Sequence, residues 1–401
     1  MAERSKRGNI LIVVMGIILC VFGIVWSFFS PKEVYDLPYI ITIIGIILAI
    51  LNIKKYISKG KALGSALSYG SAGEKSLKRT LSENGIKLAL VALLVVICCI
   101  SPAFMQARVL WDILAQSSTR IVLALGACLP LLIGGVDLSS GRMVGLSAVI
   151  AGSMVQVVTY AGRFYPNMPQ IPIIIPIILS IVVCAALGVV SGILVSKFNV
   201  NAMIATLAVQ VIVYGFAMLY IGMEPNNSQP LGNFLEAYTN LGQFKVFGKI
   251  NILVFVALGL AVLVWFVLNK TILGKNIYAI GGNHEAAVVS GINVAKYTLV
   301  IFIVAGALYG LAGVMESMRT AGATASYGAG YELDAIAACV VGGVSLNGGI
   351  GKVSGVIFGV LMFTVITYGL QFIGVDPMWQ QVFKGIIIAF AVALDEMKSR
   401  R

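Results

Sequence analysis

The segment INILVFVALGLAVLVWFVLN, residues 250–269, runs for its whole length without a charged side chain. A helix rises 1.5 Å per residue, so about 20 residues cross the roughly 30 Å hydrocarbon layer of a bilayer. The segment therefore predicts a transmembrane helix, and the chain that carries it is expected to be an integral membrane protein.

The same pattern recurs along the chain and predicts an all-α, polytopic membrane protein of twelve spans. The expected spans are 9–29, 38–53, 87–102, 113–133, 143–161, 171–195, 201–222, 250–269, 297–316, 333–346, 353–374 and 382–396. Of the 401 residues, 59% are hydrophobic and 11% are charged. Soluble domains carry roughly 25% charged residues, so this composition excludes a soluble fold.

The distribution of Lys and Arg predicts the orientation of these spans, because cytoplasmic loops retain positive charge. With the N-terminus placed inside, cytoplasmic segments hold 20 Lys and Arg residues, Arg142 among them, and outside segments hold 6. Both termini are therefore expected to be cytoplasmic, in the cell (inner) membrane. The net charge of +12 does not indicate nucleic-acid binding, since the basic residues lie between apolar runs rather than on one face.

Three regions follow from the pattern. Residues 1–53 hold two leading spans, and 54–86 form a basic cytoplasmic linker with too few apolar residues for a core. Residues 87–401 hold ten spans and are the expected working unit, with a cytoplasmic loop at 270–296. The purpose of the leading pair is open.

That loop contains a predicted short helix over 283–290. Asn283 is a good N-cap, Glu285 lies in the first turn where negative charge suits the helix dipole, and Gly291 can end the helix in the left-handed conformation. A helix this short is unstable alone in water, so it must dock on its own chain or on a partner. Ala286 and Ala287 form a small apolar face suited to close approach.

Two Gly-rich loops resemble one another. Residues 134–141 (GGVDLSSG) and 342–349 (GGVSLNGG) match at five of eight positions. Internal repeats are common in transporters, and substrate sites lie near the repeat interface. Chance similarity is the alternative, because most of the matches are Gly or Val.

Polar residues inside or beside the spans are the candidates for a translocation path, since such residues are costly in a membrane. The candidates are Asp137, Ser139, Asn201, Thr206, Tyr214, Glu316, Asp334 and Asn347. The alternative is structural: Arg120 pairs with an acidic residue, and the neutral side chains hold helices together.

Several segments resemble the branched-chain amino acid and monosaccharide permease family of ATP-binding cassette importers. They are 274–296, 134–141, 201–207 with Tyr214-Gly215, and 332–343. The resemblance covers roughly residues 87–398, and the leading 86 residues depart from it. Within the family, 114–145 and 331–351 are most similar to hexose permeases, which implies a sugar of the galactose or glucose type.

The resemblance implies an ATP-binding cassette subunit inside, a sugar-binding protein outside, and a homodimer with the path at its interface. It assigns ATPase coupling to residues of the cytoplasmic loop: Gly281, Gly282, Asn283, His284, Glu285, Ala286, Ala287, Ser290 and Gly291. The chain itself is expected not to be an enzyme and to need no cofactor or metal. Its Gly-rich stretch at 348–353 has Val353 where a phosphate-binding loop needs Ser or Thr.

Two rivals stay open at this point. An ion-coupled secondary transporter would need embedded acidic residues or His facing a cavity, and the chain has one His. A non-transporting scaffold or receptor would not need polar, Gly-rich breaks.

Overall fold

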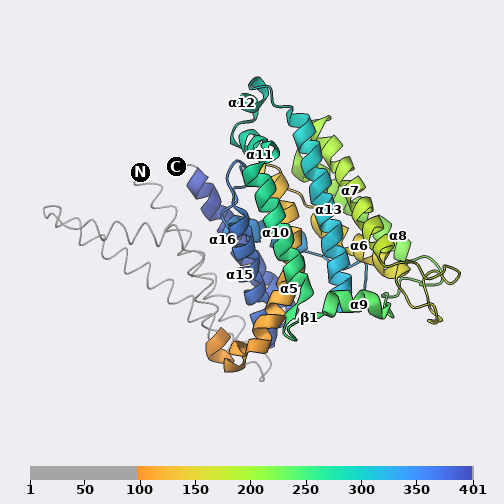
Figure 1. The fold of residues 1–401 in the computed structure, drawn as a ribbon. Helices are drawn as coiled ribbons and strands as arrows, with labels where there is room; N and C mark the ends of the chain where they lie inside the picture. Colours follow the sequence, from red (N-terminus) through yellow and green to blue (C-terminus); the bar gives the residue numbers. More distant parts are fainter. Residues whose placement is uncertain (1–96, 400–401) are drawn as a thin grey trace. The chain divides into compact units, whose positions relative to one another are not determined.

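The computed structural model describes residues 97–399, and this part of the chain is helical apart from one short hairpin (Figure 1). Its elements are η1 (Pro102–Met105), α5 (Ala107–Leu132), α6 (Ser140–Met154), α7 (Ile174–Ser196), α8 (Ala202–Ile221), α9 (Glu236–Gln243), β1 (Lys245–Val246), β2 (Ile250–Asn251), α10 (Ile252–Lys270), α11 (Ile272–Gly282), α12 (His284–Val289), α13 (Val294–Thr320), α14 (Tyr331–Val341), α15 (Val353–Phe372) and α16 (Pro377–Ser399). The predicted all-α class is confirmed for these residues.

Among residues 97–399, six helices are long and apolar enough to cross a membrane: α5, α7, α8, α10, α13 and α15. The predicted count of twelve is not confirmed. The expected spans 9–29 and 38–53, and most of 87–102, lie outside the described residues. The segment 382–396 lies in α16, a helix of 23 residues that is not among the six.

Two other expected spans form helices too short to cross a bilayer. The segment 143–161 corresponds to α6, which has 15 residues and ends at Met154. Beyond it the chain turns into extended backbone, where the Leu235 amide donates to the Val155 carbonyl at 2.8 Å. The segment 333–346 corresponds to α14, which has 11 residues and stops at Gly342, before Gly343 at φ 88°. A left-handed residue cannot continue a helix, which explains this early end.

Helix α13 lies at the centre and packs against α7, α6 and α5. Its contact with α7 depends on small residues: a Cβ on Gly188 would overlap the Phe302 carbonyl, and one on Gly306 would overlap the Cys184 carbonyl. Small residues allow membrane helices to approach closely, so these glycines set the packing of α7 against α13.

Side-chain caps begin many of the helices. Asn201, Asn251 and Asn293 accept hydrogen bonds from the backbone amides of the first turns of α8, α10 and α13. Helix α10 connects the two ends of the bundle: α9 and the β1–β2 hairpin lie at one end, and α11 and α12 lie at the other (Figure 1).

Candidate functional site

The predicted coupling loop contains two helices rather than one. Thr271 caps α11, whose last turn includes Gly281 and Gly282, so these two glycines belong to a helix and not to the expected open loop. Asn283 then caps α12 through a 2.9 Å hydrogen bond from the Ala286 amide. Gly291 follows at φ 81°. The predicted short helix, its N-cap and its left-handed end are confirmed.

Helix α12 turns one residue inward and the others outward. Ala287 is only 3% exposed and packs on its own chain, so it is not available to a partner as its apolar pattern suggested. Val288 and Val289 are 52% and 88% exposed. The remaining candidates in this loop, His284, Glu285, Ala286 and Ser290, are also exposed. The apolar surface of the tip therefore consists of the two valines.

Helix α11 is seated on both Gly-rich loops. A Cβ on Gly281 would overlap the Leu132 carbonyl oxygen and approach the Gly349 amide. That amide donates to the same Leu132 carbonyl at 2.9 Å. The Tyr278 hydroxyl donates to the Gly351 carbonyl at 2.9 Å. The end of α5, the loop before α15 and α11 thus meet at Gly281 and Gly349 with little room for a side chain, and Tyr278 adds a side-chain hydrogen bond to that loop.

The unwound segment between α5 and α6 contributes two path candidates, and α8 a third, to one buried cluster. Asp137 accepts hydrogen bonds from the Ser139 amide at 2.9 Å, the Ser139 hydroxyl at 2.6 Å and the Tyr309 hydroxyl at 3.2 Å. Thr206 on α8 accepts from the Leu138 amide at 3.0 Å. Asp137, Ser139 and Thr206 are path candidates. Their hydrogen bonds, together with that of Tyr309, join the unwound segment to α8 and α13.

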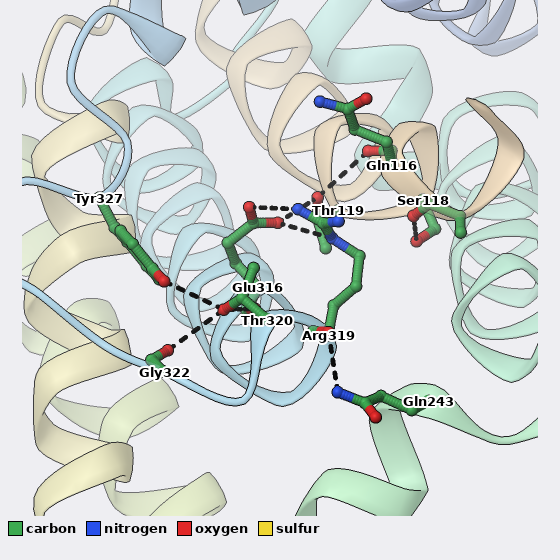
Figure 2. Close-up of polar contacts among 10 residues, drawn as sticks. Gln116, Ser118, Thr119, Gln243, Glu316, Arg319, Thr320, Gly322 and Tyr327 are labelled. Atoms are coloured by element: carbon green, nitrogen blue, oxygen red, sulfur yellow. Dashed lines mark hydrogen bonds and ion pairs between the residues drawn. The ribbon is translucent and has the colours of Figure 1, made fainter. Parts of the chain in front are cut away.

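Glu316 on α13 lies in a separate polar network (Figure 2). Its carboxylate pairs with Arg319 at 2.7 Å and accepts a 2.9 Å hydrogen bond from the Thr119 hydroxyl on α5. Thr320 donates to the Glu316 carbonyl at 2.8 Å and accepts from Tyr327 at 3.1 Å. The network joins α13 to α5 and to the loop that follows α13.

Asp334 and Arg120 belong to a third location. Asp334 on α14 forms an ion pair of 2.8 Å with Lys384 on α16. The Arg120 guanidinium lies over the ring of Tyr331, 5.3 Å from its centroid, where it makes a cation–π contact. Both residues line a small pocket between α5, α14 and α15. The structural alternative paired Arg120 with an acidic residue; among residues 97–399 the contact of Arg120 is instead with the Tyr331 ring.

Asn201 and Asn347 are exposed, and Asn201 serves as the N-cap of α8. Tyr214 faces outward on α8 and is 37% exposed. The eight path candidates therefore do not converge on one site. No group of three or more His, Cys, Asp or Glu side chains able to hold a metal occurs within 97–399.

The profile of the branched-chain amino acid transport system / permease component family matches residues 109–392 of the chain. The chain belongs to this permease family. The match starts beyond the two leading spans and the linker, and it includes every candidate residue named above. No solved structure matches the chain.

Known members of the family are similar over most of their length. The galactose/methyl galactoside import permease protein of Salmonella typhimurium is 44% identical over 333 residues, which cover 82% of this chain and 98% of that protein. Its counterpart in Treponema pallidum is 38% identical over 79% of this chain and 62% of that protein. The ribose import permease protein of Escherichia coli is 34% identical over 80% of this chain and 96% of that protein.

One set of polar residues in this permease could not be identified from the sequence. Arg142 was counted as a cytoplasmic loop charge, but it follows the unwound segment and its guanidinium lies over Tyr214, 4.2 Å from the ring centroid. Gln210 donates to the Glu332 carboxylate at 3.4 Å. The contacts depend on three distant segments, so spacing along the chain could not reveal them. Without Arg142 the charge split remains strongly in favour of cytoplasmic termini.

Proposed function

We propose that this permease is the membrane subunit of an ATP-driven monosaccharide importer, with a hexose of the galactose or glucose type as its cargo. The observation that supports the proposal is the 44% identity to a galactose/methyl galactoside import permease across 98% of that protein. Ribose import permeases are less similar, at 34% identity.

The proposed partner on the cytoplasmic side is an ATP-binding cassette subunit that receives α12. A groove on that subunit would cover the exposed Val288 and Val289, whose apolar side chains gain free energy when they leave water. Because α11 contacts Leu132, Gly349 and Gly351 directly, a displacement of α12 by the partner would move the end of α5 and the start of α15. This path couples ATP hydrolysis to alternating access.

The further assembly that we propose is a homodimer, with an extracytoplasmic sugar-binding protein at the end of the bundle that carries α9 and the hairpin. The path would lie at the interface of the two copies. Both termini would be cytoplasmic, as the charge split predicts. The ion pairs of Glu316 and Asp334 favour structural roles for these two acids over ion coupling.

The test is uptake of radiolabelled galactose by proteoliposomes that contain this permease and its ATPase subunit. We expect uptake only with ATP and the binding protein present, and no effect of an ionophore. Uptake that an ion gradient drives without the ATPase would instead support a secondary transporter.

The cargo is tested separately by titration of the binding protein with galactose, glucose, ribose and xylose, because that partner is expected to set most of the selectivity. Tight binding of a hexose supports the proposed cargo. Tight binding of only a pentose would refute the hexose and leave the importer in place.

A further inference from the structure

Helix α8 carries two polar side chains in the middle of an otherwise apolar exposed surface. Gln210 and Tyr214 are four residues apart and so lie on the same side of the helix. At 1.5 Å per residue they lie about 12 and 18 Å from the start of a helix that is about 30 Å long. Both side chains therefore lie in the central part of the membrane.

Arg142 adds a full charge at the same depth. It comes from the start of α6 and is half-buried, with its guanidinium over the Tyr214 ring. Charged side chains within membrane segments almost always face the protein interior or a water-filled cavity, because exposure to lipid is costly. This side of α8 is therefore unlike a lipid-facing surface.

Glu332 completes the cluster from a third element. It lies in the first turn of α14 and is 8% exposed. One carboxylate oxygen accepts from Gln210, and the other, Oε2, has no hydrogen-bond partner among the described residues. Oε2 lies against Gly141, where a side chain would overlap it. The N-terminus of α6 and the nearby Arg142 offset the charge of this buried carboxylate.

We propose that Tyr214 and Gln210 form a contact site for the monosaccharide on its path, with Arg142 holding the Tyr214 ring and Glu332 holding the Gln210 amide in place. This inference rests on the proposed function as a sugar importer. The partly exposed ring can stack on the C–H face of a pyranose, and the half-buried Gln210 amide can donate and accept. The Glu332 carboxylate, whose Oε2 is buried against Gly141, positions that amide through Oε1.

The chemistry of the cluster suits a neutral cargo that must leave again. Arg142 and Glu332 have opposite charges, so the cluster attracts neither anions nor cations strongly. One amide gives few hydrogen bonds, which keeps binding weak. Two discontinuous elements, α6 and α14, begin beside the cluster, as short helices do at the substrate sites of other transporters.

The first test is whether water and sugar reach this side of α8. Val211→Cys places a thiol one turn from Tyr214 and keeps every residue of the cluster. Ile212→Cys is the control: Ile212 is 48% exposed at the same depth but lies on the opposite flank, about 160° around the helix from Tyr214.

We expect a membrane-impermeant thiol reagent to modify Val211→Cys in the complete transporter, and galactose with its binding protein to slow that reaction. Ile212→Cys should stay unmodified. Because the native cysteines also react, the modified residue is identified in each variant by mass spectrometry of the labelled peptides. An unreactive Val211→Cys, or labelling that sugar does not slow, would overturn the proposal.

The second test separates sugar contact from stability. Glu332→Gln and Tyr214→Ala should each lower galactose uptake by at least about tenfold, as expected for a lost hydrogen bond or ring contact, while ATP hydrolysis stays within about twofold. Tyr214→Phe keeps the ring and should keep uptake.

If Tyr214→Phe fails as Tyr214→Ala does, or if hydrolysis falls with uptake in Glu332→Gln, the cluster is structural and the proposal is wrong. If the unsubstituted chain imports no hexose, the proposed function fails instead. The labelling of Val211→Cys by the reagent still shows in that case whether this side of α8 faces water.

Discussion

Two neighbouring glycines, Gly281 and Gly282, offer a comparison at the scale of single residues. A Cβ on Gly281 would overlap the Leu132 carbonyl, whereas a Cβ on Gly282 would meet nothing within 4 Å. Overpacking of a tight contact costs about 1–3 kcal/mol, so Gly281→Ala should shift α11 off the Gly-rich loops. We expect a fall in sugar uptake of about tenfold or more at unchanged surface expression, with ATPase binding retained.

Gly282→Ala is the control for that substitution, because it makes the same chemical change in the same helical turn. It should transport normally. Equal loss of uptake in the two variants would show that helix α11 is sensitive to any change there, and equal retention would show that the contact with Leu132 does not transmit movement. Copurification with the ATPase subunit measures the binding.

Residue-level chemistry was predictable where it depends on neighbours in the chain. The N-cap of Asn283 and the left-handed Gly291 follow from local sequence, and the structure has both. The burial of Ala287 was not predictable, because a six-residue helix gives too few turns to define a face. The position of Arg142 depends on Tyr214, more than 70 residues later, and no local rule reports such a contact.

At the scale of elements, α12 can be tested on each of its two faces. Val289→Asp places a charge on the most exposed apolar residue of the tip. Burying that charge in an apolar groove without a partner costs several kcal/mol, so ATPase affinity should fall by at least about tenfold. The permease itself should insert and dimerise normally, since Val289 is 88% exposed and supports no internal contact.

The opposite face gives a different expectation. Ala287→Arg must displace α12 from its own chain, because the side chain at this position is 3% exposed. We expect a loss of thermal stability in detergent together with a loss of coupling. An Ala287→Arg protein as stable as the parent, or a Val289→Asp protein with unchanged ATPase affinity in a pull-down titration, would contradict these assignments of the two faces.

Elements were predictable where a long apolar run has no break. The span at 250–269 corresponds to α10, at 252–270. The prediction failed at 143–161 and 333–346, where hydropathy continues past the end of the helix. Glycine explains the end of α14, and pairing with residues 233–235 explains the end of α6. A hydropathy count contains no information on tertiary contacts or backbone angles, so it could not predict where these two helices end.

At the scale of the whole molecule, the orientation of the bundle can be measured directly. The charge split places 270–296 inside and the α9 end outside. A cytoplasm-active reporter inserted near Ser71 or fused after Arg401 should be active, and one inserted near Asn240 on α9 should be inactive. An active reporter at Asn240 would place α9 and α12 on reversed sides and would remove the basis for ATPase docking at α12.

The leading 86 residues pose the last question at this scale. The family match begins at residue 109, and 82% of this chain covers 98% of the Salmonella typhimurium permease, so that relative has no counterpart of most of this region. Its two predicted spans, 9–29 and 38–53, lie outside the described residues. Removing an even number of spans leaves the orientation of the later spans unchanged. Deletion of residues 2–80 should therefore leave uptake near that of the full chain, once surface labelling confirms insertion.

A second deletion separates the spans from the charge that follows them. Removal of residues 2–53 keeps the linker, with its seven Lys and Arg residues from Lys54 to Arg79. These charges help to hold the start of the permease unit inside, according to the positive-inside rule. If the shorter deletion transports and the longer one inserts wrongly, only the linker charge is needed. If both insert correctly and neither transports, the leading spans belong to the transport mechanism, and the proposal of a separable module is wrong.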